Sequence, residues 1–257
     1  WLAANVLMGR FINIFAFLFG LSFFIQMKSA ARRGVDFRKR FLWRMAILFV
    51  IGLIGNSFFG QDILSIYAVF GVILVFLFPL KNTTLLVIAA LLLLGTPRLM
   101  IMGYDKLTKT EQVVVEQGPR QPRVMPTTFL ETAKRHLTTG LQGKLNYQFG
   151  MNGRGYITMA LFILGLVVGR LRYFKDIDKK QKLNVSLFVG FLLGTITLNY
   201  ILNWIPQEPI SFRMLMNPSY EIPLAALAVS ALHDINVVVM SGALSLGFIV
   251  LYQYKSF

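Results

Sequence analysis

The chain has 257 residues, of which 56% are hydrophobic and only 14% are charged. An ordinary soluble domain carries about 25% charged residues, so this composition argues against a soluble globular enzyme. Lys and Arg outnumber Asp and Glu by 26 to 11, a formal charge of +15. In so apolar a chain this excess of positive charge indicates cytoplasmic loops that follow the positive-inside rule, and a bilayer with anionic headgroups as the partner of the protein. It does not indicate a nucleic-acid partner. Cysteine is absent from the sequence, which excludes disulfides and thiolate metal ligands, and no metal site is predicted.

Seven stretches are long and apolar enough for membrane-spanning helices, which need about 20 residues each. An eighth apolar piece, residues 220–233, is too short to cross easily, so we expect it to re-enter, to lie at the interface or to fuse with the span after it. The predicted fold is an all-α, polytopic transmembrane helical bundle of about seven spans. In chain order these spans are Phe11–Met27, Leu42–Phe59, Ile63–Leu80, Thr84–Met102, Tyr156–Leu171, Leu183–Trp204 and Ile235–Gln253.

The short basic loops predict the orientation of these spans. Residues 28–44 hold seven Lys and Arg, and residues 172–182 hold five. By the positive-inside rule both loops are cytoplasmic, in a bacterial inner membrane. The chain then divides into a four-span part at 1–102, an extracytoplasmic loop of about 50 residues at 103–155, and a three-span part at 156–257. Because the sequence begins with Trp1, we expect further helices on either side of it.

Two local patterns refine this picture. Thr128 and Glu131 predict a capping box at the start of an amphipathic helix over 129–141, within the extracytoplasmic loop. Gly165 with Gly169, and Gly190 with Gly194, are small-xxx-small patterns that let helix backbones approach each other. We interpret both glycine patterns as packing within the chain, with a homo-oligomer interface or a membrane complex as the alternative.

Polar residues at the outer ends of the spans are the strongest functional signal, because a charged residue at the bilayer centre costs roughly 2.5–3.5 kcal/mol. Asp62 is the only carboxylate between Asp36 and Asp105. Our hypothesis is that Asp62 pairs with Arg98 or Arg10 and lies at the floor of an outward-facing cavity. The alternative is that Asp62 caps a helix at the membrane interface and that the arginines extend their side chains to that interface. The other polar residues in these positions are Asn13, Asn56, Tyr67, Asn199 and Asn203.

On the cytoplasmic side, Arg40 and Arg44 lie four residues apart on one helical face at the beginning of a span. Arg side chains match phosphate oxygens, so this pair predicts a site for a nucleotide such as coenzyme A, with a lipid-facing topogenic cluster as the alternative. Of the two histidines, His136 is expected to be an ordinary loop residue. His233 with Asp234 is a weaker candidate for a proton-handling pair.

Several segments resemble, in order and spacing, the YeiB-like family of bacterial inner-membrane proteins. They are the Phe15–Gly20 segment, the basic loop that follows it, the Asp-Ile-Leu-Ser-Ile-Tyr-Ala motif at 62–68, and the later span that ends in Gly169-Arg170. This family is distantly similar to transmembrane acyltransferases such as heparan-α-glucosaminide N-acetyltransferase. Those enzymes move an acyl group from cytoplasmic acyl-CoA to an acceptor across the membrane.

The resemblance implies an acyl-CoA co-substrate at Arg40 and Arg44 and an acceptor site at Asp62, with Asp62, Tyr67 and Asn56 as the candidate catalytic residues. Many family members have a His shortly before the Asp, where this chain has Gly55-Asn56. Two other functions stay open. The polar outer ends also fit a transporter or a binding protein for a lipid or small molecule, and the chain also fits a non-catalytic scaffold subunit.

Overall fold

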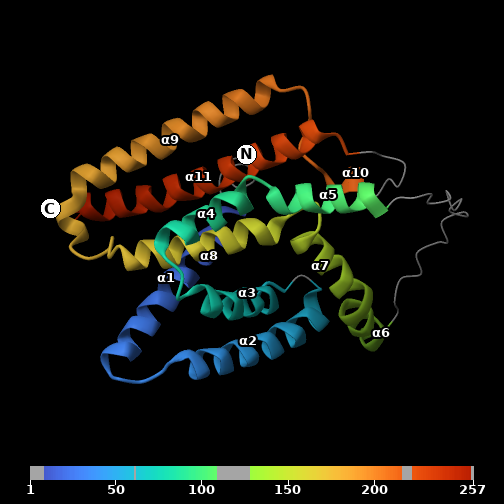
Figure 1. Ribbon diagram of the computed structural model, residues 1–257, viewed down its shortest axis with the longest axis horizontal. Coiled ribbons are helices and arrows are strands. Elements are labelled where there is room, and N and C mark those ends of the chain that lie inside the picture. The colour runs from blue at the N-terminus through green and yellow to red at the C-terminus, as the bar shows by residue number, and fades with distance from the viewer. Residues whose placement is uncertain (1–8, 61, 109–127, 216–221, 256–257) are drawn as a thin grey trace, which may run out of the picture.

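The computed structural model describes residues 9–60, 62–108, 128–215 and 222–255, and the regular elements in these ranges are all helices (Figure 1). The all-α class is therefore confirmed. In chain order the helices are α1 (Arg10–Arg32), α2 (Arg38–Phe59), α3 (Leu64–Leu77), α4 (Asn82–Leu93), α5 (Thr96–Thr108), α6 (Phe129–Arg135), the π-helical turn η2 (His136–Gly140), α7 (Leu141–Phe149), α8 (Arg154–Arg170), the 3-10 turn η3 (Ile177–Lys180), α9 (Gln181–Trp204), α10 (Phe212–Leu215) and α11 (Leu224–Lys255).

The number of candidate membrane spans is four to six among the described residues, against the seven expected. Helices α1, α2, α9 and α11 are each long and apolar enough to cross a membrane. Two bent pairs qualify only when each pair is taken as one broken span: α4 with α5, and α6–α7 with α8. Helix α3 has 14 residues, about 21 Å at 1.5 Å per residue, which is shorter than a hydrocarbon core of about 30 Å. The long apolar helices fit a multi-pass membrane protein.

Two spans differ from the sequence prediction in their boundaries. The expected span Thr84–Met102 was wrong as one continuous helix, because α4 and α5 meet at a bend of 57°. Gly95 lies between them with φ +78°, a left-handed conformation that glycine adopts without steric cost. At the other end of the chain, the short piece 220–233 fuses with the span after it, since α11 runs unbroken for 32 residues from Leu224.

Much of the stretch expected to be an extracytoplasmic loop is helical. Residues 109–127 lie outside the described residues, but the chain is helical from Phe129 to Phe149. Thr128 Oγ1 accepts a hydrogen bond from the Glu131 N–H at 3.3 Å, which confirms the predicted helix start. Helix α6 and the turn η2 pack against α2, and α7 packs against α8. This segment therefore belongs to the helix bundle and helps to form its cavity.

Helix α8 lies at the centre of the bundle and packs most extensively against α1 and α4. A Cβ atom on Gly165 would lie 2.0 Å from the Phe17 carbonyl oxygen, and one on Gly20 would lie 1.9 Å from that of Phe162. Backbones this close require glycine, so the packing interpretation of Gly165 is confirmed. In contrast, a Cβ on Gly190 of α9 would have no neighbour within 4 Å.

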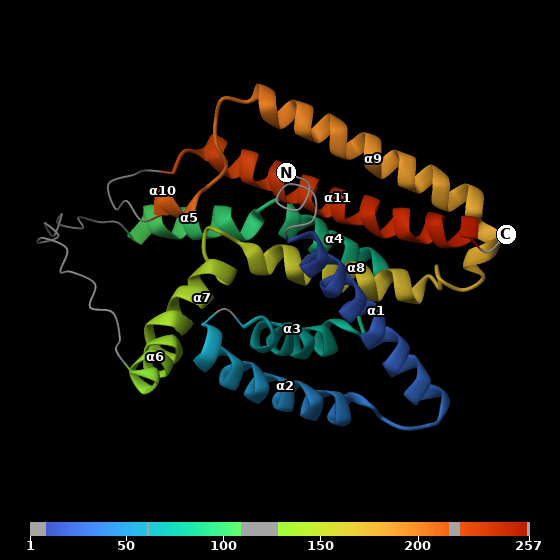
Figure 2. The ribbon, with the colours of Figure 1, turned by 180° about the vertical axis from the view of Figure 1, so that it is seen from behind.

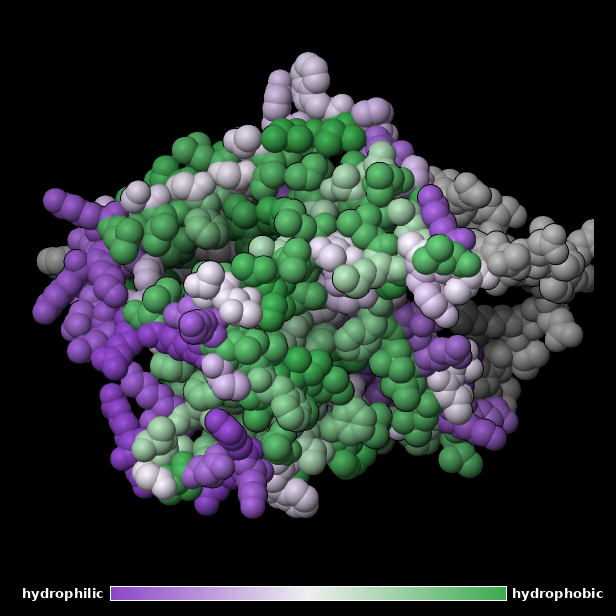
Figure 3. Space-filling model, in the orientation of Figure 1, coloured by the Kyte–Doolittle hydropathy of each residue, from purple (hydrophilic) through white to green (hydrophobic). Residues whose placement is uncertain are grey.

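The basic loops lie at one end of the bundle. Figures 1 and 2 show the α1–α2 connection, the α3–α4 connection and the α8–α9 connection at the same end, and Figure 3 shows hydrophilic residues there beside an apolar band. Arg170, the last residue of α8, joins two of these connections by donating to the carbonyl of Leu80 at 2.7 Å and to Asn82 Oδ1 at 2.9 Å. The α2–α3 connection and α7 lie at the opposite end.

Candidate functional site

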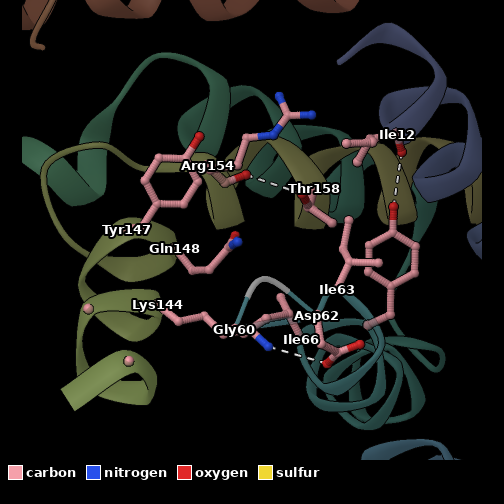
Figure 4. A pocket seen from close by; sticks show the side chains of 13 residues that line it. Ile12, Gly60, Asp62, Ile63, Ile66, Lys144, Tyr147, Gln148, Arg154 and Thr158 are labelled. Atoms are coloured by element: carbon pink, nitrogen blue, oxygen red, sulfur yellow. Dashed lines mark hydrogen bonds and ion pairs between the residues drawn. The ribbon is translucent and has the colours of Figure 1, made fainter. Parts of the chain in front are cut away.

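A cavity of about 510 Å³ opens at the end of the bundle opposite the basic loops. Helices α1, α3, α7 and α8 and the α2–α3 connection all contribute to its wall (Figure 4). Its polar side chains come from Asp62, Tyr67, Lys144, Tyr147, Gln148, Arg154 and Thr158, and its apolar ones from Ile12, Ile63 and Ile66.

The best-connected polar group of the cavity is the ammonium of Lys144 in α7. Its Nζ lies 3.2 Å from Asp62 Oδ2 and 2.7 Å from Ser65 Oγ. The side-chain oxygen of Asn56 lies 3.5 Å from the same nitrogen. The side chains of Lys144 and Asp62 are only 6% and 7% exposed, so the two form a buried ion pair with additional polar partners, the arrangement that a buried charge requires.

Asp62 lies two residues before the first residue of α3, and its carboxylate binds N–H groups of the first turn of that helix. Its Oδ1 accepts a hydrogen bond from the Leu64 N–H at 2.8 Å, and its Oδ2 accepts one from the Ser65 N–H at 2.9 Å. Burial raises the pKa of the Asp62 carboxyl, but the hydrogen bonds from Ser65 and Leu64 and the charge of Lys144 outweigh burial and hold the pKa below its ordinary value of 3.8. A carboxylate so stabilised holds Lys144 in place and is a weak proton acceptor at neutral pH.

Asn56, near the end of α2, connects the ion pair to the turn η2. Its side chain is fully buried, and its Nδ2 donates to the carbonyl of His136 at 3.0 Å. His136 Nδ1 in turn lies 3.1 Å from the Ser57 carbonyl; since a carbonyl only accepts, Nδ1 is the donor of this contact. The imidazole lies over Gly60, where a Cβ would approach it to 3.1 Å. The sequence analysis expected His136 to be an ordinary loop residue and did not anticipate this position.

The opposite wall of the cavity carries a second cation and a phenol. Tyr67 is buried and donates from its hydroxyl to the Ile12 carbonyl at 2.9 Å. Arg154, at the beginning of α8, donates to Asn13 Oδ1 at 2.6 Å. Figure 4 shows Arg154 on the far side of the cavity from the Lys144–Asp62 pair, with Gln148 between them and Tyr147 beside Arg154. The lining therefore carries two cations and one carboxylate.

A second, smaller cavity of about 220 Å³ adjoins the first, because both are lined by Tyr147 and Arg154. Besides Arg154, its charged groups are Arg98 of α5 and Asp234 of α11, with Arg98 Nη1 2.6 Å from Asp234 Oδ2. Arg98 is 2% exposed and also donates to the carbonyls of Met151 and Asn152. His233 lines this cavity as well, while its neighbour Asp234 is engaged by the arginine.

The expected ion pair between Asp62 and Arg98 was wrong. Asp62 pairs with Lys144 and Arg98 with Asp234, so the structure contains two separate buried pairs among its described residues. The physical reason is the bend at Gly95, which directs α5 towards α11 and away from the α2–α3 connection. Arg10, the other residue proposed to pair with Asp62, is the first residue of α1.

The predicted nucleotide residues lie elsewhere. Arg40 and Arg44 are exposed in the first turns of α2, at the basic end of the bundle. Arg44 donates to Gln26 Oε1 at 2.7 Å and lies 5.4 Å from the centre of the Phe37 ring. Asn56 lies sixteen positions after Arg40 in α2, about 24 Å at 1.5 Å per residue. Asn199 also lies apart from the cavity and pairs with Asn236 between α9 and α11.

Lys144, Tyr147 and Arg154 belong to the site although they were not predicted from the sequence. The signal that would have revealed the first two is helical periodicity: Gly140, Lys144, Tyr147 and Gln148 recur at spacings of three and four residues, so they share one face of a helix. Arg154 gave no such signal, because it was assigned to a loop and not to the first turn of a buried helix.

In the part of the chain that the structure describes, the fold is all-helical with four to six candidate membrane spans, and a polar cavity lies at the end away from the basic loops. The chain is 26% identical over 202 residues to "Uncharacterized protein YxaH" of Bacillus subtilis (strain 168), a match covering 71% of this chain and 48% of that protein. It is 34% identical over 85 residues to "Uncharacterized 39.9 kDa protein in amylase 3'region" of Bacillus acidopullulyticus, covering 33% of this chain and 25% of that protein.

This chain therefore spans about half the length of the first of these relatives and about a quarter of the second. No protein-family model matches the chain. No solved structure matches it either. These matches neither confirm nor contradict the resemblance to the YeiB-like family, which stays a prediction.

Proposed function

We propose that this protein is a multi-pass membrane protein of a bacterial inner membrane that binds, and in its membrane setting transports, an anionic small molecule or lipid in the cavity of about 510 Å³. The observation that carries the proposal is the pair of cations, Lys144 and Arg154, that line one cavity with a single carboxylate, Asp62. The cavity keeps one positive charge in excess, and an anion that binds there meets two basic side chains of opposite walls.

The ligand class follows from the rest of the lining. Ile12, Ile63 and Ile66 supply an apolar wall, while Tyr147 and Gln148 supply polar groups beside the cations. Pockets of this kind orient a ligand with a few polar groups and gain contact area from apolar ones. We therefore infer an amphiphilic acid, with a carboxylate or phosphate at Lys144 and Arg154 and a short hydrocarbon part against the isoleucines.

The proposed orientation rests on the basic loops. Residues 28–44 and 172–182 lie at the end of the bundle away from the cavity, and short basic loops are retained in the cytoplasm. The cavity then opens on the extracytoplasmic side, where its ligand enters from outside or from the outer leaflet.

The test compares probes that share an eight-carbon chain and differ only in headgroup charge. The full chain is purified in dodecyl maltoside, and its melting temperature Tm is measured with octanoate, octyl phosphate, octylammonium and octyl glucoside. A ligand at a hundred times its Kd stabilises the folded state by about 2.7 kcal/mol. We expect the two anions to raise Tm and the cation and the neutral glucoside to leave it within error.

Two variants and a matched control locate the effect. Arg154→Gln removes one cation and with it the excess positive charge of the cavity. The double variant Asp62→Asn/Lys144→Met keeps that excess but leaves an anion with one basic side chain instead of two. Both are expected to abolish the anion-dependent rise in Tm. Lys134→Met removes a cation from the exposed surface of α6 and is expected to keep it. Equal stabilisation by octyl glucoside, or a loss in the Lys134 variant, would contradict the proposal.

Acyl transfer from cytoplasmic acyl-CoA is the second candidate function. The observation that favours it is the imidazole of His136, which lies over Gly60. The backbone carbonyl of the same residue accepts a hydrogen bond from Asn56, whose side-chain oxygen lies 3.5 Å from Lys144 Nζ. A general base beside the acceptor site is what such a reaction needs. Transfer of a labelled acyl group from acyl-CoA to a membrane lipid, abolished in His136→Ala, would favour this candidate. The separation of about 24 Å between Arg40 and Asn56 along α2 is the reason that binding is proposed first.

A further inference from the structure

We propose a second site, at the basic end of the bundle, that binds an anionic phospholipid: its phosphate headgroup between α1 and the α8–α9 connection, and an acyl chain between α1, α8, α9 and α11. Its basic groove lies at the opposite end of α8 from the cavity around Lys144. Two adjoining grooves and the network that holds the connection between them carry the inference.

The first groove has a volume of about 400 Å³ and a strongly basic lining. Lys28 and Arg32 reach it from the last turns of α1, and Arg172 and Lys175 reach it from the chain that follows α8. Ser29 adds a hydroxyl, and none of the described residues that line the groove is acidic. Four cations from two separate segments thus face one concave surface without a carboxylate among them, which is the charge pattern that a phosphate group complements.

The segment that supplies two of these cations has an unusual backbone. Arg172 has φ 53° and Asp176 has φ 55°, a left-handed conformation that residues other than glycine adopt rarely. Such conformations persist only where the surrounding structure holds them, and they concentrate at binding sites. Here the left-handed residues turn the chain back at the end of α8, so that Arg172 and Lys175 line the same groove as Lys28 and Arg32.

A buried polar network holds this turn. The Tyr173 hydroxyl donates to Asn184 Oδ1, and Asn184 Nδ2 donates to Gln253 Oε1 at 3.1 Å. Gln253 Nε2 then donates to the Ile177 carbonyl at 2.6 Å, while Lys180 donates to the Tyr173 carbonyl at the same distance. Asn184 and Gln253 are buried, and satisfied buried networks of this kind make a structure rigid. The groove is therefore formed before any ligand binds.

The second groove is almost entirely apolar and has a volume of about 390 Å³. It shares Val168, Tyr173 and Phe174 with the basic groove, so the two are continuous. Beyond these residues it is lined mainly by side chains such as Phe17, Leu164, Leu187, Phe191 and Leu246. A ligand that fills both grooves has a phosphate at one end and a hydrocarbon chain at the other.

This continuity favours a phospholipid over inorganic phosphate or a nucleotide. The apolar groove lies among apolar side chains of α1, α8, α9 and α11, helices that include three of the candidate membrane spans, where acyl chains are the available partner. A chain moving from the bilayer into this groove gains van der Waals contact but no hydrophobic free energy, so selectivity among lipids comes from the headgroup. Basic pockets between membrane helices on the cytoplasmic side bind anionic headgroups for the same reason.

The experiment measures lipid binding to the full chain by native mass spectrometry in dodecyl maltoside. Palmitoyl-oleoyl phosphatidylglycerol and palmitoyl-oleoyl phosphatidylcholine are compared, because they share acyl chains and differ in net charge. We expect the protein to retain one phosphatidylglycerol with at least tenfold higher affinity than phosphatidylcholine. The variant Arg32→Gln/Lys175→Gln, at exposed positions of the groove, is expected to lower that preference about tenfold.

Three comparisons decide the outcome. Arg38→Gln/Lys39→Gln removes the same charge from exposed residues of the same end that do not line the groove, and is expected to change the preference less than twofold. Val168→Phe places a larger side chain where the grooves meet and is expected to weaken both lipids. The proposed site is overturned if Arg38→Gln/Lys39→Gln lowers the preference for phosphatidylglycerol as much as Arg32→Gln/Lys175→Gln does. It is also overturned if Arg32→Gln/Lys175→Gln leaves lipid binding unchanged. Displacement of phosphatidylglycerol by an equal concentration of glycerol phosphate, or full binding in Val168→Phe, overturns the acyl-chain part.

Discussion

Replacing Lys144 by methionine removes the centre of the polar cluster in the cavity. Methionine keeps a flexible apolar chain of similar length but cannot donate to Asp62, Ser65 or Asn56, which lie 2.7–3.5 Å from the Lys144 ammonium. The consequence is a carboxylate, only 7% exposed, that has lost its counterion.

The size of the expected loss in stability depends on the hydrogen bonds that Asp62 keeps in the variant. Removing one partner of a buried ion pair costs about 3–5 kcal/mol. Asp62 still accepts hydrogen bonds from the Leu64 and Ser65 N–H groups at 2.8 and 2.9 Å, so we expect the lower end of this range, about 3 kcal/mol. At roughly 2–4 °C per kcal/mol for a chain of this size, Tm falls by about 6–12 °C.

A double-mutant cycle in dodecyl maltoside, with Tm and the free energy of unfolding as readouts, tests the reasoning. In Asp62→Asn/Lys144→Met the buried charge is absent, so the double variant is expected to be more stable than Lys144→Met alone by at least about 1 kcal/mol. Lys134→Met, an exposed change in α6, should stay within about 0.5 kcal/mol of the parent. If the double variant is less stable than Lys144→Met, the ion pair does not account for the loss.

Three further predictions concern other parts of the molecule. The folded-state pKa of Asp62 lies below its ordinary value of 3.8. The stability that its charged carboxylate contributes to the folded protein is therefore present above pH 3.8 and is lost as the pH falls through the folded-state pKa. Tm of the parent should fall more steeply in acid than Tm of Asp62→Asn. Gly165→Leu should cost several kcal/mol or prevent folding, since even a Cβ would lie 2.0 Å from the Phe17 carbonyl, whereas Gly190→Leu, with open space around its Cβ position, should leave Tm nearly unchanged; equal effects in the two would refute the α1–α8 contact. Arg98→Leu should destabilise by about 3–5 kcal/mol and be partly rescued by Asp234→Leu, because the rescue removes the unpaired carboxylate; an additive double variant would argue against the pair.

The local features that the sequence alone predicted rest on interactions between near neighbours. Long apolar stretches predicted α1, α2 and α9 within a few residues of their bounds, because a helix satisfies its own backbone hydrogen bonds. Thr128 predicted the beginning of α6 through a contact three residues away. Gly165 predicted a close helix approach, although not that α1 would be the partner.

The number of spans was harder to predict, because hydropathy does not distinguish a helix that crosses a membrane from one that is buried in protein. The apolar segment of α3 is short, and α4 and α5 are separated by a bend at Gly95 that no hydrophobic average registers. The segment 128–149 is too polar to be recognised as part of the bundle, yet it packs against α2 and α8.

The composition and the charge pattern of the sequence determined that this is an apolar helical protein, and placed Asp62, Asn56 and Tyr67 among its candidate site residues. Only the tertiary structure decided which charged residues form ion pairs with each other. Asp62 and Lys144 are 82 residues apart, and Arg98 and Asp234 are 136 apart. At such separations the choice of partner depends on helix packing and on one glycine bend. A count of charges along the chain includes neither, and for that reason Arg98 was proposed as a partner of Asp62, where the structure places Lys144.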